Sequence, residues 1–332
     1  MQKAKNTGTN LTFKHIVIGG NGFLGQEIIR KLSAKKNTNI IVVDLFEISG
    51  NKFPFIKCDI SKRAQVSKIP IEKNDIVHHL ASRLIVPNKP RFGRYRYFES
   101  TSIVGTKNIL KLMREKNCRK MIFWSSDMVY GIKHTFPIYE NDIPTPIGEY
   151  GETKLIAEKL VKNEIEKENL KCTIFRPRLI IGTGRLGILK NLFYLAKHNL
   201  PIPLIGNGNN FFQFVSVSDC ANATILAVQN GVPSKIYNLG SEKPYPTKEL
   251  LTKFISHINS KSIILPVPSI LILSILRFLN FFKISPMDKE QFLIADKNMV
   301  LSSLKAYKDL KWKPKDNDLE MLLNAYRTYN IK

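Results

Sequence analysis

HIVIGGNGFLG, residues 15–25, is the stretch that decides the fold, because it sets three glycines between an apolar strand (15–18) and a predicted helix (26–33). Gly19, Gly22 and Gly25 have the spacing of a dinucleotide-binding turn. Side chains there would block the tight turn, the approach of a pyrophosphate to backbone N–H groups, or the packing of helix on strand. The stretch predicts a βαβ nucleotide-binding unit, in which Phe23 and Leu24 complete the loop against the cofactor.

The second predicted strand (40–43) ends in an acidic residue, Asp44. A carboxylate about twenty residues after a glycine loop accepts hydrogen bonds from the adenosine ribose hydroxyls. It also repels a 2′-phosphate, so the sequence favours NAD over NADP; the alternative is an ordinary aspartate that starts a turn. Asp59 and Ile60 follow the third apolar run (55–56), where a carboxylate can reach the adenine amino group.

Apolar runs and helical stretches alternate over the first half of the chain. The apolar runs are residues 55–56, 76–80, 121–124 and 172–175, and the helical stretches include 104–116 and 154–167. This alternation predicts an α/β fold, a Rossmann-type doubly wound parallel sheet. We expect a disordered tail over 1–13, an NAD-binding domain over 14–176, and a smaller mixed α/β substrate-binding part over 177–332. Some segments of the last part are expected to return to the first domain.

Composition narrows the class of protein and of partner. The chain has 332 residues, 43% of them hydrophobic and 23% charged, as is typical of globular proteins. Its formal charge of +24 favours anionic partners, or else reflects a lysine-rich solvated surface. No nucleic-acid-binding motif accompanies the charge, so we expect no such partner. The four cysteines form no Cys-x-x-Cys pair, so we expect no metal site and a reducing cytoplasm.

Tyr150 and Lys154 stand at positions i and i+4, which places both side chains on one face of a helix. Tyr307 and Lys311 share this spacing, but Tyr150 also opens a long helix and follows Ser126 at a strand end. A phenol is a poor base at neutral pH, and a nearby ammonium stabilises its phenolate form. We therefore assign Tyr150 as the acid/base, Lys154 as its support and the ligand of the nicotinamide ribose, and Ser126 as donor to the substrate oxygen.

The ordered set of motifs resembles the NAD-dependent epimerase/dehydratase family of extended short-chain dehydrogenases/reductases over about residues 14–325. The motifs are GGNGFLG (19–25), HLAS (79–82), SSDMVYG (125–131), YGETK (150–154) and RP (176–177). The resemblance implies a Rossmann domain, bound NAD, frequent homodimers and a nucleoside-diphosphate sugar substrate. It also places Leu80, Ala81 and Ser82 against the cofactor.

Three departures from the family's pattern bear on the reaction. In the sugar 4,6-dehydratases that this chain resembles, an Asp-Glu pair follows the catalytic hydroxyl; here Asp127 matches but Met128 replaces the carboxylate, so a dehydratase is not expected. Ser102 stands where such enzymes hold an asparagine. Phe212 and Ser216 stand where UDP-sugar epimerases grip the diphosphate with Arg and His. The candidate substrate-binding residues are Arg83, Asp127, Arg178 and Phe212.

Residues 263–282 are largely apolar, with Arg277 as the only charge. The part free of prolines, 269–283, would form a helix about 22 Å long, short of the roughly 30 Å hydrocarbon core of a bilayer. A narrow polar stripe runs along it, formed by Ser274, Arg277 and Asn280. Two interpretations stay open. Residues 263–283 form a core helix of the substrate domain, or they attach a cytoplasmic protein peripherally to the inner face of the membrane.

Basic residues gather in the loop after the fourth apolar run, where family members bring substrate and nicotinamide together. They are Arg83, Lys89, Arg91, Arg94 and Arg96. These residues either replace the missing diphosphate clamp or form a solvated loop. Together with the apolar segment they suggest a sugar on a polyprenyl diphosphate as an alternative to a nucleotide-linked sugar.

The leading hypothesis is an NAD-dependent sugar epimerase that acts at C4 through a transient keto intermediate. A dehydrogenase or reductase of a sugar, sterol-like or other lipid alcohol would use the same Ser126, Tyr150 and Lys154. A non-catalytic dinucleotide sensor is the contrasting class, and the presence of all three catalytic residues argues against it.

Overall fold

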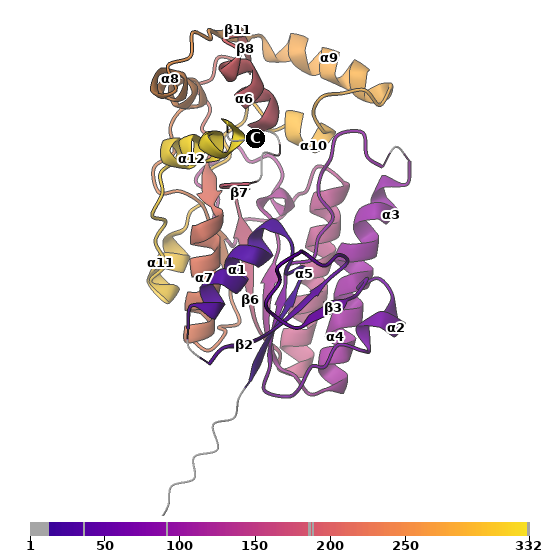
Figure 1. Cartoon of the computed structure of the whole chain (residues 1–332). Coiled ribbons are helices and arrows are strands. Elements are labelled where there is room, and N and C mark those ends of the chain that lie inside the picture. The colour runs from indigo at the N-terminus through magenta and orange to yellow at the C-terminus, as the bar shows by residue number, and fades with distance from the viewer. Residues whose placement is uncertain (1–12, 36, 91, 185–186, 188, 331–332) are drawn as a thin grey trace, which may run out of the picture.

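The computed structural model describes residues 13–330 apart from 36, 91, 185, 186 and 188. The predicted tail lies outside this range except for Phe13, and so does Arg91 of the basic loop. The described chain forms a sheet domain with a smaller lobe set on one end of it (Figure 1).

Seven parallel strands form the central sheet. They are β1 (Lys14–Ile18), β2 (Asn39–Asp44), β3 (Phe55–Lys57), β4 (Ile76–His79), β5 (Lys120–Trp124), β6 (Lys171–Pro177) and β10 (Ile236–Leu239). Their order is β3-β2-β1-β4-β5-β6-β10, so the chain reverses its direction of winding between β1 and β4. The predicted Rossmann-type doubly wound parallel sheet is confirmed. In such sheets a ligand binds at the carboxyl ends of the strands beside this reversal.

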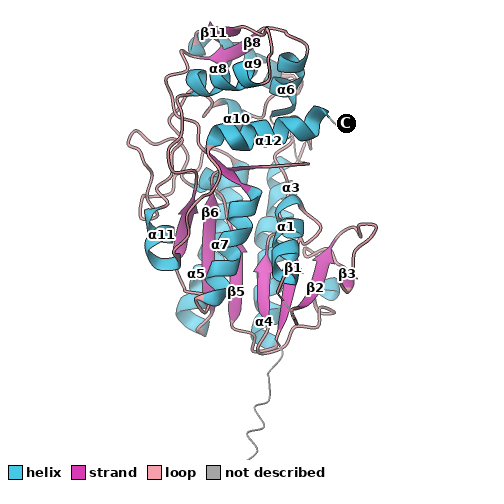
Figure 2. Cartoon of the chain, turned by 60° about the vertical axis from the view of Figure 1, so that its left-hand side comes forward, coloured by secondary structure: helices cyan, strands magenta, loops and turns pink. Residues whose placement is uncertain are grey.

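Helices cover both faces of the sheet (Figures 1 and 2). On one face lie α1 (Phe23–Ser33), α7 (Val217–Gln229) and α11 (Leu304–Leu310); on the other lie α2 (Arg63–Val66), α3 (Arg94–Glu99), α4 (Thr106–Glu115) and α5 (Glu149–Glu168). Ile28 of α1 is fully buried on the first face, and Val161 of α5 on the second. Because apolar strands meet helices on both sides, they are apolar throughout rather than alternating.

The smaller lobe lies beyond the carboxyl ends of the strands (Figure 2). Its elements are α6 (Leu189–Lys197), β8 (Ile202–Ile205), α8 (Thr247–His257), β11 (Ile264–Val267), α9 (Ser269–Phe281), α10 (Lys289–Phe292) and α12 (Asp318–Asn330). Phe193, Phe254 and Tyr326 pack ring against ring in its core. A parallel pair, β7 (Leu179–Ile181) and β9 (Phe214–Ser216), connects the lobe to the sheet domain. Parts of the chain beyond residue 176, including β10, join the central sheet.

The structure of α9 disagrees with the interpretation of residues 263–282 as a core helix. Leu276 is its buried residue, whereas Ile270, Phe278 and Phe281 are 85, 64 and 78% exposed. The core-helix interpretation is therefore wrong, because the apolar side of α9 faces outward. Over the residues that the structure describes, no helix is long and apolar enough to cross a membrane.

Candidate functional site

The glycine loop leads from β1 into α1. Gly19 has a φ of +82°, and a Cβ on it would lie 2.7 Å from the backbone nitrogen of Ala81 at the end of β4. A Cβ on Gly25 would overlap the carbonyl oxygen of Gly19, so the start of α1 packs directly on the loop. Gly22 precedes the first turn of α1, and its side-chain-free backbone leaves the N–H groups of the helix end accessible to an anion. This cradle fits the pyrophosphate of a dinucleotide.

Asp44 stands at the end of β2, and its carboxylate accepts hydrogen bonds from the backbone N–H groups of Asn21 at 2.9 Å and Leu45 at 2.7 Å. It is therefore held beside the glycine loop, where we assigned the ribose hydroxyls. Asp59 accepts hydrogen bonds from the N–H and hydroxyl of Ser61 at 3.0 and 2.7 Å. Burial raises the pKa of Asp59, but these bonds and nearby positive charges outweigh it and hold the pKa below its usual value.

The remaining residues assigned to the cofactor surround the same loop. Leu24 and Ile60 are buried in the two cores, and Ile60 packs under Gly105 at the start of α4. Phe23 points its ring toward Gly182, after β7. Leu80, Ala81 and Ser82 follow β4, with the N–H of Leu80 bonded to the Ile18 carbonyl at 2.9 Å. The cofactor candidates thus converge at the carboxyl ends of β1, β2 and β4.

Ser126 and Lys154 meet at the end of β5. The Ser126 hydroxyl accepts a hydrogen bond from the Met128 N–H at 3.2 Å and donates one to Asp127 at 3.1 Å. The Lys154 ammonium, which is buried, donates to the Trp124 carbonyl at 2.9 Å. Burial lowers the pKa of Lys154 to about 8, with the nearby Glu158 carboxylate opposing the shift. An ammonium with such a pKa titrates near the working range of an acid/base tyrosine.

Tyr150 lies in the first turn of α5, one turn before Lys154. A Cβ on the next residue, Gly151, would approach the Met128 carbonyl oxygen at 2.5 Å, so the start of α5 presses on the turn that follows Ser126. The Tyr150 ring packs edge-on against Phe98 at 5.5 Å and contacts the small apolar cluster around Met128. Two elements far apart in sequence thus bring Ser126, Tyr150 and Lys154 to one place.

Glu290 of α10 is part of this arrangement, and the sequence reasoning missed it. Its carboxylate accepts the backbone N–H groups of Tyr150 at 3.0 Å and Gly151 at 3.3 Å, which belong to the amino-terminal turn of α5. A Cβ on Gly148 would overlap the Glu290 side chain. Burial raises the pKa of Glu290 to about 7, although both hydrogen bonds lower it. A carboxylate at a helix amino terminus is held by the helix dipole as well as by these bonds.

A salt-bridge group surrounds this contact. Arg94 of α3 lies 2.5 Å from the Asp288 carboxylate and 3.2 Å from that of Glu149. Asp288 caps α10, and Glu149 begins α5. Arg94 therefore joins the basic loop, the catalytic helix and the lobe, and it is not a freely solvated residue of that loop.

Three of the four substrate candidates form one group beside Ser126, in which Asp127 and Arg178 are buried and Phe212 is half-buried. Arg178 donates to Asp127 at 2.6 Å, and its guanidinium lies 4.2 Å from the centroid of the Phe212 ring. Because Asp127 also contacts Ser126, the group reaches the hydroxyl of the serine that the sequence predicts to be catalytic. Arg83 lies apart from it, with its guanidinium over the Tyr97 ring at 5.1 Å. The charge of Arg83 acts on Asp59, on the cofactor side of the sheet edge.

The residues that depart from the family's pattern have structural partners. Met128 is buried with Ile294 and Met299, so no carboxylate stands at this point. Ser216 caps α7 by accepting the Asp219 N–H at 3.0 Å. Ser102 lies in a π-helical segment (Ser100–Gly105), and within the described part of the chain its buried hydroxyl has no hydrogen-bond partner. Such segments occur within α-helices and are frequent at functional sites.

A buried ion pair fixes α5, the helix that carries Tyr150 and Lys154, on the sheet. Arg176 of β6 forms two hydrogen bonds with Glu158, at 2.9 and 2.6 Å, one helical turn beyond Lys154. Arg176 also donates to the Tyr130 hydroxyl at 2.8 Å, which in turn donates to Asn238 of β10 at 2.8 Å. These bonds join α5, β6 and β10, so the distance between the catalytic helix and the strand ends is determined by packed, fully bonded groups.

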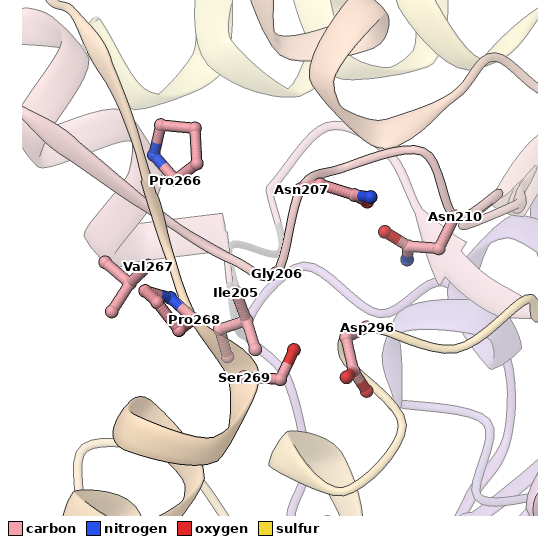
Figure 3. Close-up of a pocket in the computed structure, with 9 residues that line it drawn as sticks. All are labelled: Ile205, Gly206, Asn207, Asn210, Pro266, Val267, Pro268, Ser269 and Asp296. Carbon is pink, nitrogen blue, oxygen red and sulfur yellow. The ribbon is translucent and has the colours of Figure 1, made fainter.

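A hollow of about 370 Å³ lies away from these residues, in the lobe. Figure 3 shows it between the β8 turn (Gly206, Asn207), Pro266 to Pro268 and the first residue of α9, Ser269. It contains none of the predicted site residues, and we do not assign it to the reaction. Within the described ranges, no group of three or more His, Cys, Asp or Glu side chains is placed to hold a metal ion.

Comparison with known proteins agrees with this geometry. A family model, the NAD dependent epimerase/dehydratase family, matches residues 15–240. The UDP-glucose 4-epimerase of Lactobacillus helveticus is 28% identical over 265 residues, 72% of this chain and 79% of that protein. The human sterol-4-alpha-carboxylate 3-dehydrogenase, decarboxylating, is 27% identical over 257 residues, 73% of this chain and 62% of that protein.

Among solved structures, UDP-glucuronic acid 4-epimerase from Bacillus cereus, in complex with NAD, has the same fold. Its TM-score is 0.76 at 18% identity, covering 96% of this chain and 99% of that one. The family model matches most of the chain, and the glycine cradle and the Asp44 carboxylate agree with it. The chain therefore belongs to the NAD-dependent epimerase/dehydratase family and is an NAD-dependent enzyme.

Proposed function

We propose that the chain is an NAD-dependent epimerase that inverts C4 of a sugar carried on a diphosphate. The observation that supports this most is the convergence of Tyr150 and Lys154, on the first turns of α5, with Ser126 at the end of β5. The 4-epimerase named above is similar to this chain over most of its length.

The reaction follows from what each side chain offers. Tyr150, as phenolate, takes the proton of the C4 hydroxyl, and the buried Lys154 ammonium stabilises that phenolate. Ser126 donates a hydrogen bond to the same substrate oxygen and supports the charge on it. NAD held by the glycine loop and Asp44 would supply the acceptor for the C4 hydride and the donor for its return. The 4-keto sugar rotates in the site, so that the hydride returns to its opposite face. Tyr150 then returns the proton to the oxygen, and atoms and electrons balance without an external oxidant.

Met128 argues against water elimination as the outcome. A 4,6-dehydratase needs a base that takes the C5 proton, and Met128 has no ionisable group and packs into an apolar cluster. The keto sugar therefore has no route to eliminate water at this position, and return of the hydride is its productive fate. Arg178 and Phe212 flank Asp127 there and are the residues that we propose contact the sugar.

The carrier of the sugar is a nucleotide or a polyprenyl diphosphate. Phe212 and Ser216 replace the Arg and His with which UDP-sugar epimerases hold the diphosphate, and Ser216 is occupied as a helix cap. The basic residues after β4 supply positive charge instead, with Arg83 and Lys89 belonging to neither salt bridge of Arg94. This arrangement supports binding of a diphosphate from a different side.

The proposal is tested with UDP-glucose and UDP-N-acetylglucosamine that carry deuterium at C4, each incubated with the purified, NAD-containing protein. Internal return of the hydride predicts an epimerised product that retains the deuterium, without stoichiometric NADH at 340 nm. If these are not turned over, the same labelled sugars on a short polyprenyl diphosphate are the second substrates. Absence of C4 inversion with either carrier, or loss of the deuterium to solvent, would contradict the proposal.

A dehydrogenase is the second candidate, because a decarboxylating sterol dehydrogenase is also similar to this chain and because α9 is apolar and exposed. The catalytic residues would be the same. The difference is measurable, since a dehydrogenase accumulates one NADH per product with a lipid alcohol and an epimerase does not.

A further inference from the structure

Helix α9 presents apolar side chains to the outside along one side. Leu271, Ile275 and Phe278 follow one another at the spacing of a single helical face, and all three are exposed. Ile270, Phe281 and Phe282 widen this face, and Phe281 is 78% exposed. Figure 1 shows α9 at the outer edge of the lobe, away from the sheet. A contiguous exposed apolar surface of this kind marks an interaction site.

The loop between β4 and α3 extends this surface. The Asn88 side chain donates to the Ser285 carbonyl at 2.6 Å, and Arg94 pairs with Asp288, so the loop lies against the segment that follows α9. The loop exposes Leu84, Val86 and Phe92, the last by 80%. We call the exposed apolar residues of α9, of the short segment that follows it and of this loop the α9 face. They are Leu84, Val86, Phe92, Ile270, Leu271, Ile275, Phe278, Phe281, Phe282 and Ile284.

The charges around the α9 face are positive. Residues 258–289 contain one carboxylate, Asp288, which is buried against Arg94, whereas their four basic residues are exposed. These are Lys261, Arg277, Lys283 and Lys289. Residues 83–97 contain several basic residues and no carboxylate. Asp296 lies at the hollow beside Ser269, the first residue of α9 (Figure 3). Its carboxylate lies 3.2 Å from the Lys297 ammonium.

We propose that the α9 face docks on the surface of a bilayer that contains anionic phospholipids, with α9 lying parallel to the surface. Apolar side chains in the acyl boundary and basic side chains at the headgroups are what binds a helix of this kind. At about 20 Å for its 13 residues, α9 is too short to cross the hydrocarbon core.

A second copy of this chain fits the α9 face less well. A symmetric dimer through α9 would bring together two copies of a surface whose exposed charges, over residues 258–289, are all basic. Like charges brought together at an interface oppose association. Anionic headgroups are opposite in sign to every exposed charge that residues 258–289 carry.

The docking itself does not depend on the proposed function. Its consequence, that the carrier of the sugar substrate is a lipid, rests on that proposed function. The α9 face borders the proposed catalytic site for two reasons. The loop follows β4, whose end lies among the cofactor candidates, and α10, which follows α9, bonds Tyr150 through Glu290. An enzyme bound there meets a sugar diphosphate whose lipid is in the same bilayer. Vesicle binding is measured without substrate, so its failure leaves epimerisation of a nucleotide sugar open.

The test is flotation of the full-length protein with vesicles of phosphatidylcholine alone and of phosphatidylcholine with an equal part of phosphatidylglycerol. The wild type is expected to float with the anionic vesicles and to remain largely unbound with the neutral ones. Phe278→Ser with Phe281→Ser should lower the partition coefficient by about a hundredfold, because two aromatic side chains no longer enter the acyl boundary. Lys283→Glu with Lys289→Glu should lower it at least about tenfold.

Helix α11 offers the matched control. Tyr307→Ser with Lys308→Glu changes an exposed aromatic and an exposed basic residue remote from α9 (Figure 1), and it should leave flotation within about twofold of wild type. Absence of wild-type flotation with anionic vesicles would overturn the proposal. Equal loss in the control variant would do so too, since general charge would then explain binding. A wild-type dimer that the phenylalanine variant converts to monomer, without an effect on flotation, would assign the face to a second copy.

Discussion

The carboxylate of Glu290 accepts the backbone N–H of Tyr150 at 3.0 Å, although 140 residues separate the two in sequence. The bond joins the lobe to the first turn of the catalytic helix, next to the phenol that we assign to proton transfer. Because α10 follows α9 directly in the chain, the same contact lies between the exposed apolar helix and Tyr150. The position of Tyr150 therefore depends on the lobe as well as on the sheet.

Glu290 gives a prediction about pH and stability. Burial raises its pKa to about 7 in the folded protein, against 4.5 for an ordinary glutamate, so the folded state binds this proton more tightly than the unfolded state. The contribution of Glu290 to stability is thus fully present below about pH 4.5 and is lost as pH rises toward 7, by at most about 3 kcal/mol. Glu290→Gln removes this dependence.

Urea unfolding of wild type and Glu290→Gln at pH 5 and pH 8 measures the effect. At pH 5 the variant is expected to be less stable by about 1 kcal/mol, because its amide accepts only one of the two N–H groups well. At pH 8 the difference should shrink or reverse. An unchanged difference between the two pH values would show that Glu290 does not titrate in this range.

Gly19 and Gly50 form a matched pair for the cofactor cradle. Both have a φ near +80°, at +82° and +81°, but a Cβ on Gly19 meets the Ala81 backbone whereas a Cβ on Gly50 meets nothing within 4 Å. Alanine at either position should cost about 1–2 kcal/mol of stability through backbone strain. Only Gly19→Ala should also weaken NAD binding, by more than about tenfold, since the loop must move away from β4. NAD titration by quenching of protein fluorescence checks this, and equal affinities in the two variants would refute it.

The pKa of Lys154 gives a prediction about how turnover depends on pH on the alkaline side. Its pKa is lowered to about 8 by burial, so the ammonium that supports the Tyr150 phenolate is lost as pH rises through 8. Turnover should therefore fall above that pH. Lys154→Met should lower kcat by about a hundredfold at neutral pH, while Lys154→Arg should keep part of the activity and lose the alkaline fall, since arginine stays charged. A pH profile of kcat that is the same for lysine and arginine would contradict this role.

The sheet was predictable from sequence because its signals are local. Gly19, Gly22 and Gly25 come directly after an apolar strand, and Asp44 closes the next one. The order of strands then follows from parallel pairing and short crossovers. The placement of the three residues that we propose as catalytic was also predictable, since Tyr150 and Lys154 share a helix face and Ser126 follows a strand.

The rest depends on contacts between distant segments, which have no local signature. Glu290 lies in a four-residue helix that is too short to show periodicity. The Asp127–Arg178 pair joins residues 51 apart, and the sequence named both without indicating that they neutralise each other. For α9, the polar stripe of the sequence showed a two-sided helix but not which side meets the protein. In the structure, the side of α9 that contains the buried Leu276 packs against the rest of the protein.

Replacement of Tyr150 by phenylalanine tests the central claim most directly. The ring still packs against Phe98, and the backbone N–H still bonds Glu290, so the folded protein and its NAD content should be retained. With the C4-deuterated sugar that the wild type epimerises, kcat should fall by at least about a hundredfold, the amount expected for loss of a general acid/base group. Turnover near the wild-type rate in a folded, NAD-containing variant would show that another group moves the proton.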